Sequence, residues 1–166
     1  MECLFGDVID GKMKLSEIGE IVCDEWIKTE QIRTNVMLDE WIIMPNHFHA
    51  IVVIDNDNAI GHVGAYCNTP LHCNTPLHCN TPLRTNNRFR SPSNNLGAIV
   101  RSFKSSVKRQ CNKNNFTYFQ WHRNYFENVI RNEIALNNIR EYIVNNPMQW
   151  EFDENNPSTR FHRASL

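Results

Sequence analysis

The feature that most constrains the fold is an apolar run behind a pair of histidines. Residues 44–55 read "MPNHFHAIVVID", and the tail "AIVVI" offers no polar residue to either face of a strand. Such a uniformly apolar run is unusual in a strand at the edge of a sheet. We therefore predict a central strand over residues 47–55. Residues 34–44, "TNVMLDEWIIM", predict a second strand, separated from the first by a short break at Pro45-Asn46.

Periodicity and turn residues predict the other elements. In chain order they are a hairpin over residues 2–16 with its turn at Asp10-Gly11, a helix over 16–30 capped by Ser16, an amphipathic helix over 94–110, a strand within the aromatic-rich segment 116–130, and a helix from the Asn132 cap to Pro147.

Length and composition indicate the number of domains and the kind of protein. The 166 residues fit one domain spanning 1–166. No apolar stretch approaches the ~18 residues of a membrane span, so we expect no membrane. The N-terminus lacks a basic segment followed by an apolar core, which favours the cytoplasm. There the six cysteines are expected to be reduced thiols.

A six-residue unit repeats three times from Cys67 to Arg84 as "CNTPLHCNTPLHCNTPLR". The proline in every unit blocks regular structure. We therefore expect a disordered or loosely held low-complexity insertion at about residues 56–93. Because cysteine and histidine recur, a zinc-binding protein stays open as an alternative, although the C-x5-C-x5-C spacing matches no familiar finger or ribbon.

The formal net charge of −1 conceals a strong segregation of charge. Between Asn58 and Phe126 the chain has no Asp or Glu but has nine Lys and Arg residues. On the helix over 94–110, Arg101, Lys104 and Lys108 fall on one flank. A solvated helix flank is the simpler interpretation, but the missing acids favour a polyanionic partner such as DNA.

Two pairs of residues carry the candidate chemistry. His47 and His49 are two apart on a strand, so their imidazoles face the same side. Tyr142 and Asn146 are four apart on a helix, one turn from each other. Taken singly, each residue is ordinary. Together, two imidazoles and an amide oxygen can ligate a divalent cation, and a nearby tyrosine can attack a phosphorus atom. This set predicts metal-assisted transesterification of DNA.

Four segments, "MPNHFHAIVVI", "LGAIVRSFKSSVKR", "WHRNYFENVIRNE" and "IREYIVNNPMQW", occur in this order. They resemble the REP-associated tyrosine transposases, which belong to the single-tyrosine branch of the HUH endonucleases. The resemblance runs from about Glu2 to residue 153, without the repeats. It implies that His47 and His49 bind Mg²⁺ or Mn²⁺, that Tyr142 is the nucleophile, and that Asn146 is the third ligand.

The resemblance also implies a reaction and a partner. The enzyme would nick and rejoin single-stranded DNA at imperfect, palindromic hairpins through a 5′-phosphotyrosine, as a monomer or a homodimer. For DNA binding we assign backbone contacts and base stacking to six residues: Arg101, Lys104, Lys108, Arg109, Trp121 and Tyr125. The alternative is a catalytically inactive remnant that binds hairpins without cutting them.

The fold that the resemblance implies is of the α+β class and ferredoxin-like, with four antiparallel strands and helices on one face. Members of that family usually begin with an extra central strand, whereas here Met1 directly precedes "ECLFG". We therefore expect an N-terminally truncated domain whose histidine strand has lost a neighbour and exposes unpaired backbone groups. Two explanations stay open: a true start further upstream, or a decayed copy.

Overall fold

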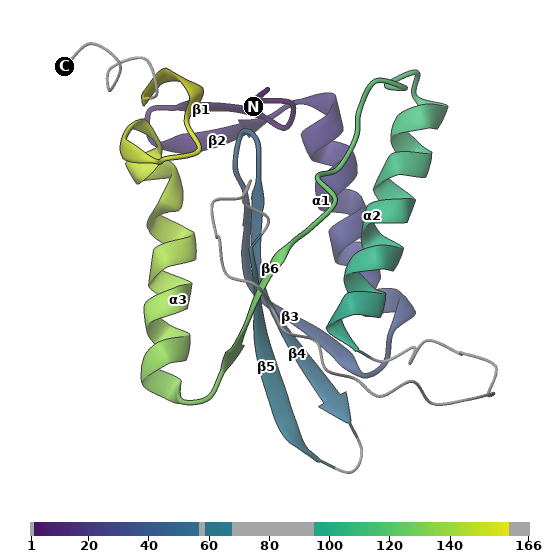
Figure 1. Cartoon of the computed structure of the whole chain (residues 1–166), viewed down its shortest axis with the longest axis vertical. Coiled ribbons are helices and arrows are strands. Elements are labelled where there is room, and N and C mark those ends of the chain that lie inside the picture. The colour runs from purple at the N-terminus through teal and green to yellow at the C-terminus, as the bar shows by residue number, and fades with distance from the viewer. Residues whose placement is uncertain (1, 57–58, 68–94, 160–166) are drawn as a thin grey trace, which may run out of the picture.

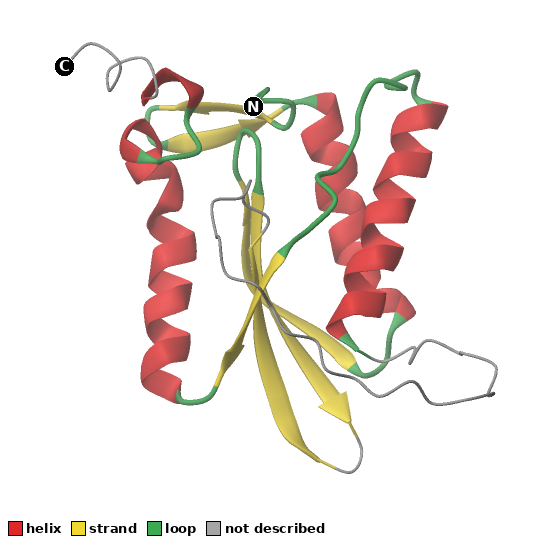
Figure 2. Ribbon diagram, in the orientation of Figure 1, coloured by secondary structure: helices red, strands yellow, loops and turns green. Residues whose placement is uncertain are grey.

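The computed structural model describes residues 2–56, 59–67 and 95–159. Along the chain the elements are β1 (Gly6–Ile9), β2 (Lys12–Leu15), α1 (Glu17–Ile32), β3 (Val36–Ile43), β4 (Phe48–Asn56), β5 (Ala59–Cys67), α2 (Leu96–Lys113), β6 (Phe126–Ile130), α3 (Glu133–Asn145) and the 3₁₀ helix η1 (Asn146–Phe152). Figure 2 shows the mixture of helices and strands that confirms the α+β class.

The main sheet has four antiparallel strands in the order β3-β4-β5-β6. β4 pairs with β3 on one side and with β5 on the other, so the prediction of a central strand is confirmed. The expected loss of a neighbour was wrong, because β5 supplies that neighbour.

β5 lies inside the segment that we had assigned to the insertion. The expected insertion begins at about residue 56, but "AIGHVGAYC" still alternates in a way that suits a strand and pairs with both β4 and β6. Residues 68–94, with nearly all of the repeat and the zinc hypothesis attached to it, lie outside the described residues.

Helices cover both faces of the sheet (Figure 1). Phe48, Ala50 and Val52 of β4 pack in the cluster with α1 and α2. The intervening Ile51 packs with α3 through Ile143. The expectation of helices on one face was therefore wrong. The physical reason is the apolar tail of β4, which carries large apolar groups on both faces and needs cover on both.

The core between α1, α2 and the sheet is aromatic. Trp26 of α1 is fully buried and packs edge-to-face against Phe48 and Phe103, with ring centroids 4.9 and 5.0 Å away. Beside it, the buried carboxylate of Glu25 accepts hydrogen bonds from Lys28 on its own helix and from Ser106 of α2. These contacts fix α2 against α1. The predicted core face of α2 is confirmed, since Ile99, Val100, Phe103 and Val107 are buried and Leu96 is partly buried.

The β1–β2 hairpin packs near the end of the molecule where β4 begins (Figure 1). Its turn is as predicted: Asp10 and Gly11 both have positive φ, 51° and 69°. At the entry to the hairpin, the Phe5 N–H donates to the Pro45 carbonyl oxygen at 2.9 Å. This bond holds the chain just before the two histidines.

The predicted helix caps are also in place. The Ser16 hydroxyl accepts from the Gly19 N–H, and the Asn132 side chain accepts from the Ala135 N–H. None of the helices in the described part of the chain is both long and apolar enough to cross a membrane. Cys3, Cys23 and Cys111 are free thiols.

Candidate active site

The candidate site lies where β4 begins and α3 ends. His47 immediately precedes β4 and His49 is its second residue. Because alternate residues of a strand face the same side, both histidines share the face of Ile51, which is the face that α3 covers. Their rings meet edge-to-face with centroids 4.7 Å apart.

The last turn of α3 brings the tyrosine and the asparagine to these rings. The Tyr142 ring centroid lies 5.4 Å from that of His49, also edge-to-face. Pro147 ends the α-helical hydrogen bonding, and Asn146 begins η1 while keeping helical torsions. Tyr142 and Asn146 both line a pocket of about 380 Å³. Tyr142 is half exposed and Asn146 is buried. The structure thus brings the four predicted residues together.

A hydrogen-bond chain sets the orientation of His47. Asn46 donates from Nδ2 to the Asn155 carbonyl oxygen at 2.7 Å, which fixes the amide and turns its Oδ1 to His47 Nδ1, 2.8 Å away. An amide oxygen can only accept, so Nδ1 of His47 carries the proton. The lone pair is then on Nε2, which is the atom that a metal would use.

Two buried atoms of the site have no hydrogen-bond partner among the described residues: His47 Nε2 and Asn146 Oδ1. Buried polar atoms are normally satisfied, so such a pair asks for an explanation. Imidazole nitrogen and amide oxygen are both ligands of divalent cations. His47, His49 and Asn146 therefore have the donor chemistry to hold Mg²⁺ or Mn²⁺.

Among the described residues, acidic side chains do not complete a metal site with the histidines in the arrangement that the structure shows. Within residues 2–56, 59–67 and 95–159, no three His, Cys, Asp or Glu side chains converge closely enough to hold a metal ion by themselves. A cation bound by the two histidines would accordingly need the Asn146 amide oxygen or a rearranged carboxylate. Asp153 is the carboxylate at hand, with Oδ2 3.9 Å from His47 Nε2.

Both histidines are electrically neutral at pH 7. Burial lowers the pKa of His47 to about 4. Burial, reinforced by the neighbouring His47, lowers the pKa of His49 to about 3, against a weaker opposing effect of Asp153. The neutral imidazole is the form that ligates metals, so the site needs no deprotonation before it binds one.

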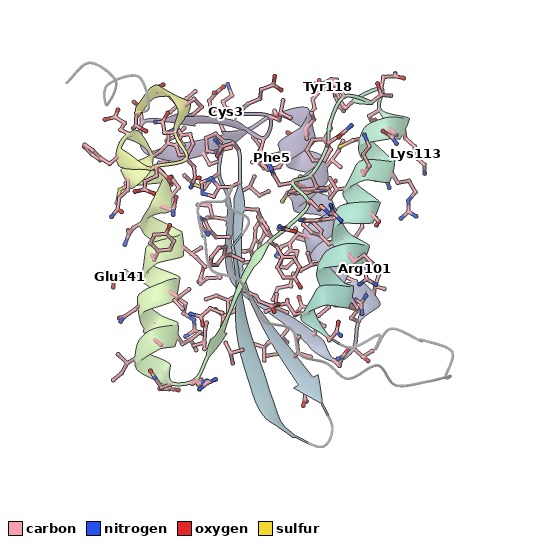
Figure 3. The ribbon with its side chains drawn as sticks, viewed as in Figure 1. Cys3, Phe5, Arg101, Lys113, Tyr118 and Glu141 are labelled. Carbon is pink, nitrogen blue, oxygen red and sulfur yellow. The ribbon has the colours of Figure 1, made fainter. Side chains whose placement is uncertain are left out.

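The predicted DNA-binding residues are not part of this site. They belong to α2 and the segment after it, whereas α3 lies across the sheet. Figure 3 labels Arg101 and Lys113 on α2 and Glu141 on α3, with the sheet between the two helices. The sequence suggested one continuous surface, but the structure separates the basic helix from the tyrosine.

Lys104 and Lys108 also donate hydrogen bonds within the protein. Lys104 Nζ donates to the His122 and Asn124 carbonyl oxygens at 3.0 and 3.2 Å, and burial lowers its pKa. Lys108 Nζ donates to the Thr117 carbonyl oxygen at 3.0 Å and to a second carbonyl nearby. Both lysines therefore hold the connection between α2 and β6, in addition to any contact with DNA.

Trp121 and Tyr125 are likewise partly buried. The Trp121 ring packs against Phe5, Phe103 and Phe119, with centroids 5.2 to 5.7 Å away. Lys104 Nζ lies 5.7 Å from the ring centroid of Trp121 and 5.8 Å from that of Tyr125. Both rings therefore have a structural role: Trp121 packs against the core, and both rings contact the Lys104 ammonium group.

Arg109 has a more open position. It lines a pocket of about 440 Å³ on the α2 side, together with Lys104, Lys108, Gln120 and Trp121. Its guanidinium donates to the Ser106 hydroxyl at 3.1 Å. We refer to this hollow on the basic face of α2 as the Arg109 pocket.

Sequence reasoning missed two residues of the site. Asn46 was interpreted only as part of the break after Pro45, although its position next to His47 was a usable signal. Asp153 lies beyond the predicted helix and follows no periodicity, so only the fold of η1 brings it to the histidines.

The fold and this site define an α+β protein in which two buried histidines, an asparagine and a half-exposed tyrosine converge beside a central strand. The sequence is also similar to that of a known protein: the chain is 37% identical, over 153 residues, to an uncharacterized protein of Haemophilus influenzae. The aligned region covers 92% of this chain and 77% of that protein, so the chain belongs to the same family. No family model matches the chain, and neither does any solved structure.

Proposed function

We propose that this protein is a DNA strand transferase of the tyrosine transposase type, which nicks and rejoins hairpin-containing single-stranded DNA in the cytoplasm with Mg²⁺ or Mn²⁺. The observation that carries the proposal is the convergence of His47, His49, Tyr142 and Asn146 from two elements far apart in sequence. The acid-free basic stretch and the resemblance of the four sequence segments support the choice of DNA.

Each residue has a defined part in the proposed reaction. The Tyr142 oxygen attacks a backbone phosphorus, a Tyr–O–P bond forms, and the bond from phosphorus to the 3′ oxygen breaks. The phenolic proton passes to solvent, and the departing oxygen takes up a proton as a free 3′-OH. A second 3′-OH reverses these steps and joins a new strand without ATP, because the phosphotyrosine conserves the energy of the diester.

The pocket around Tyr142 suits such a nucleophile. The Tyr142 ring packs edge-on against His49 and the residue is half exposed, which suits a nucleophile that must be both held and open to a polymer. His47, His49 and Asn146 would hold the cation. When bound, it supplies polarisation of the phosphate and compensation of the negative charge that develops there.

The basic face of α2 would contribute affinity rather than chemistry. DNA held in the Arg109 pocket would lie across the sheet from Tyr142. One hairpin would therefore need to extend around the sheet to contact both the Arg109 pocket and Tyr142. Contacts of this kind neutralise phosphates and position the strand without reading its sequence. We therefore expect Arg109→Ala to weaken hairpin binding more steeply at low salt than at high salt.

The test is a covalent adduct. The full chain is mixed with Mn²⁺ and labelled single-stranded hairpins from the DNA that flanks its own gene, and denaturing gels are scanned for a protein–DNA band. We expect an adduct that Tyr142→Phe and His49→Ala abolish. Tyr118→Phe is the matched control, because Tyr118 is also exposed but lies in the connection between α2 and β6. It should leave the adduct intact.

Two other outcomes would contradict the proposal. A native gel shift without any adduct would favour the hairpin-binding remnant. An adduct that survives in Tyr142→Phe would place the nucleophile elsewhere.

A further inference from the structure

Asp153 has a role that neither the sequence segments nor the four-residue site assigns. We propose that its carboxylate is an additional, anionic ligand of the metal ion held by His47, His49 and Asn146. This inference rests on the proposed function, because it deepens the description of the same site.

The first argument concerns what faces the Asp153 carboxylate. Since Asn46 fixes the proton of His47 on Nδ1, the nitrogen 3.9 Å from Asp153 Oδ2 presents a lone pair. His47 is fully buried and its Nε2 has no hydrogen-bond partner among the described residues. A lone pair and a carboxylate oxygen repel each other across such a gap. A cation between them converts the repulsion into attraction.

The second argument concerns the remaining donors. Asp153 lines the same pocket as Tyr142 and Asn146. The Asn146 Oδ1 atom is a second buried acceptor without a partner in the described part of the chain. Asp153 thus stands beside both unpartnered acceptors, facing His47 Nε2 and sharing a pocket with Asn146. Divalent cations such as Mg²⁺ favour carboxylate oxygen, and two neutral imidazoles with an amide supply no negative charge.

The distances define what must move. Adjacent ligand atoms at about 2.1 Å from an octahedral cation lie about 3 Å apart, so the Asp153 carboxylate must approach His47 by about 1 Å. The rest of the side chain is already held: Asp153 Oδ1 accepts from the Asn155 N–H at 2.7 Å. One carboxylate oxygen thus anchors the turn after η1, which leaves the other to face the metal site.

Because the two carboxylate oxygens have different roles, a substitution can remove the charge of Asp153 and keep its hydrogen bond to the backbone. In Asp153→Asn, the amide oxygen can keep the bond from the Asn155 N–H while the negative charge is lost. Asp153→Ser is a second variant, whose hydroxyl can also accept from that N–H. Glu154→Gln is the matched control, since Glu154 lines the same pocket one residue further along.

The experiment measures binding of Mn²⁺ alone to the full chain, by titration calorimetry and by the electron paramagnetic resonance signal of free Mn²⁺. We expect one site in the wild-type protein, affinity at least tenfold weaker in Asp153→Asn and Asp153→Ser, and affinity within twofold of wild type in Glu154→Gln. His49→Ala should abolish the site. Urea unfolding without metal confirms that each variant is folded.

The outcomes separate this inference from the proposed function. If both Asp153 variants bind Mn²⁺ as tightly as wild type while His49→Ala does not, Asp153 is not a ligand and the three-residue site stands. If wild type itself binds no Mn²⁺, both the ligand role of Asp153 and the metal site are refuted.

Discussion

Mild acid should destabilise this protein well before its carboxyl groups titrate. In the folded chain the pKa of His47 is lowered to about 4 and that of His49 to about 3, in each case mainly by burial. In the unfolded chain both return to the ordinary value of 6.5. Below pH 6.5 the unfolded state therefore binds protons that the folded state does not, and stability is lost as the pH falls towards the folded values.

The size of the effect follows from these values. At pH 5 an unfolded histidine is almost fully protonated while His47 and His49 are still neutral in the fold, and proton linkage then costs about 2 kcal/mol for each ring. The free energy of unfolding should thus fall by roughly 4 kcal/mol between pH 7.5 and 5, which is a large part of the stability of an ordinary domain.

Carboxylates act in a separate window. Hydrogen bonds from Arg140 lower the pKa of Asp39. A lowered carboxyl pKa contributes stability that is present above the ordinary value and lost only as the pH falls through the folded one. Since ordinary carboxyl values are about 4, losses between pH 6.5 and 5 report mainly on the histidines.

The assay is urea unfolding without metal at pH 7.5, 6.5, 5.5 and 5.0, followed by tryptophan fluorescence. His49→Gln should remove about half of the decrease, because one of two titrating rings is gone. His122→Gln is the matched control, because His122 is exposed in the connection between α2 and β6, and it should leave the decrease unchanged. A stability that stays flat from pH 7.5 to 5, or falls equally in His49→Gln, would refute the reasoning.

Substitutions at three further positions test the local structure that positions the site. Gly19→Ala, which in most helices stabilises, should here cost about 1–3 kcal/mol, because the new Cβ would lie 2.1 Å from the Phe5 carbonyl oxygen; unchanged urea stability would show that this contact relaxes freely. Ile143→Ala should lower the free energy of unfolding by about 2–5 kcal/mol, since Ile143 packs α3 on β4; a loss below 1 kcal/mol would mean that α3 is held elsewhere. Asn132→Ala should cost about 1 kcal/mol by removing the cap of α3, whereas Asn132→Ser should cost little.

How much of the fold could be predicted depended on whether the signal was local. The Asp10-Gly11 turn, the Ser16 and Asn132 caps and the core face of α2 are written into short segments, and they were predicted correctly. β5 was missed because it runs into the first residue of the repeat, and the polar residues before it looked like the start of an insertion. The position of α3 was missed because a sequence does not say which face of a sheet a helix will cover.

The same distinction applies to the candidate site. The spacing of His47 and His49, and of Tyr142 and Asn146, predicts two pairs, and the fold joins the pairs where β4 begins and α3 ends. What could not be predicted is the environment: Asn46 turned to His47 and Asp153 facing its Nε2. Both depend on the path of the chain after Pro147, which has no periodic pattern.

The basic helix and the tyrosine lie on opposite sides of the sheet, yet one short stretch of chain connects them. Lys104 and Lys108 of α2 hold the carbonyl groups of residues 117–124, and the chain then runs through β6 into α3. A ligand that competes for these ammonium groups would remove one support of that stretch, whereas β6 keeps its pairing with β5 and Ile130 keeps its packing with Ile143. In the proposed function, DNA bound on α2 would therefore act on the connection between α2 and β6, and the support of α3 on the sheet through Ile143 would stay in place.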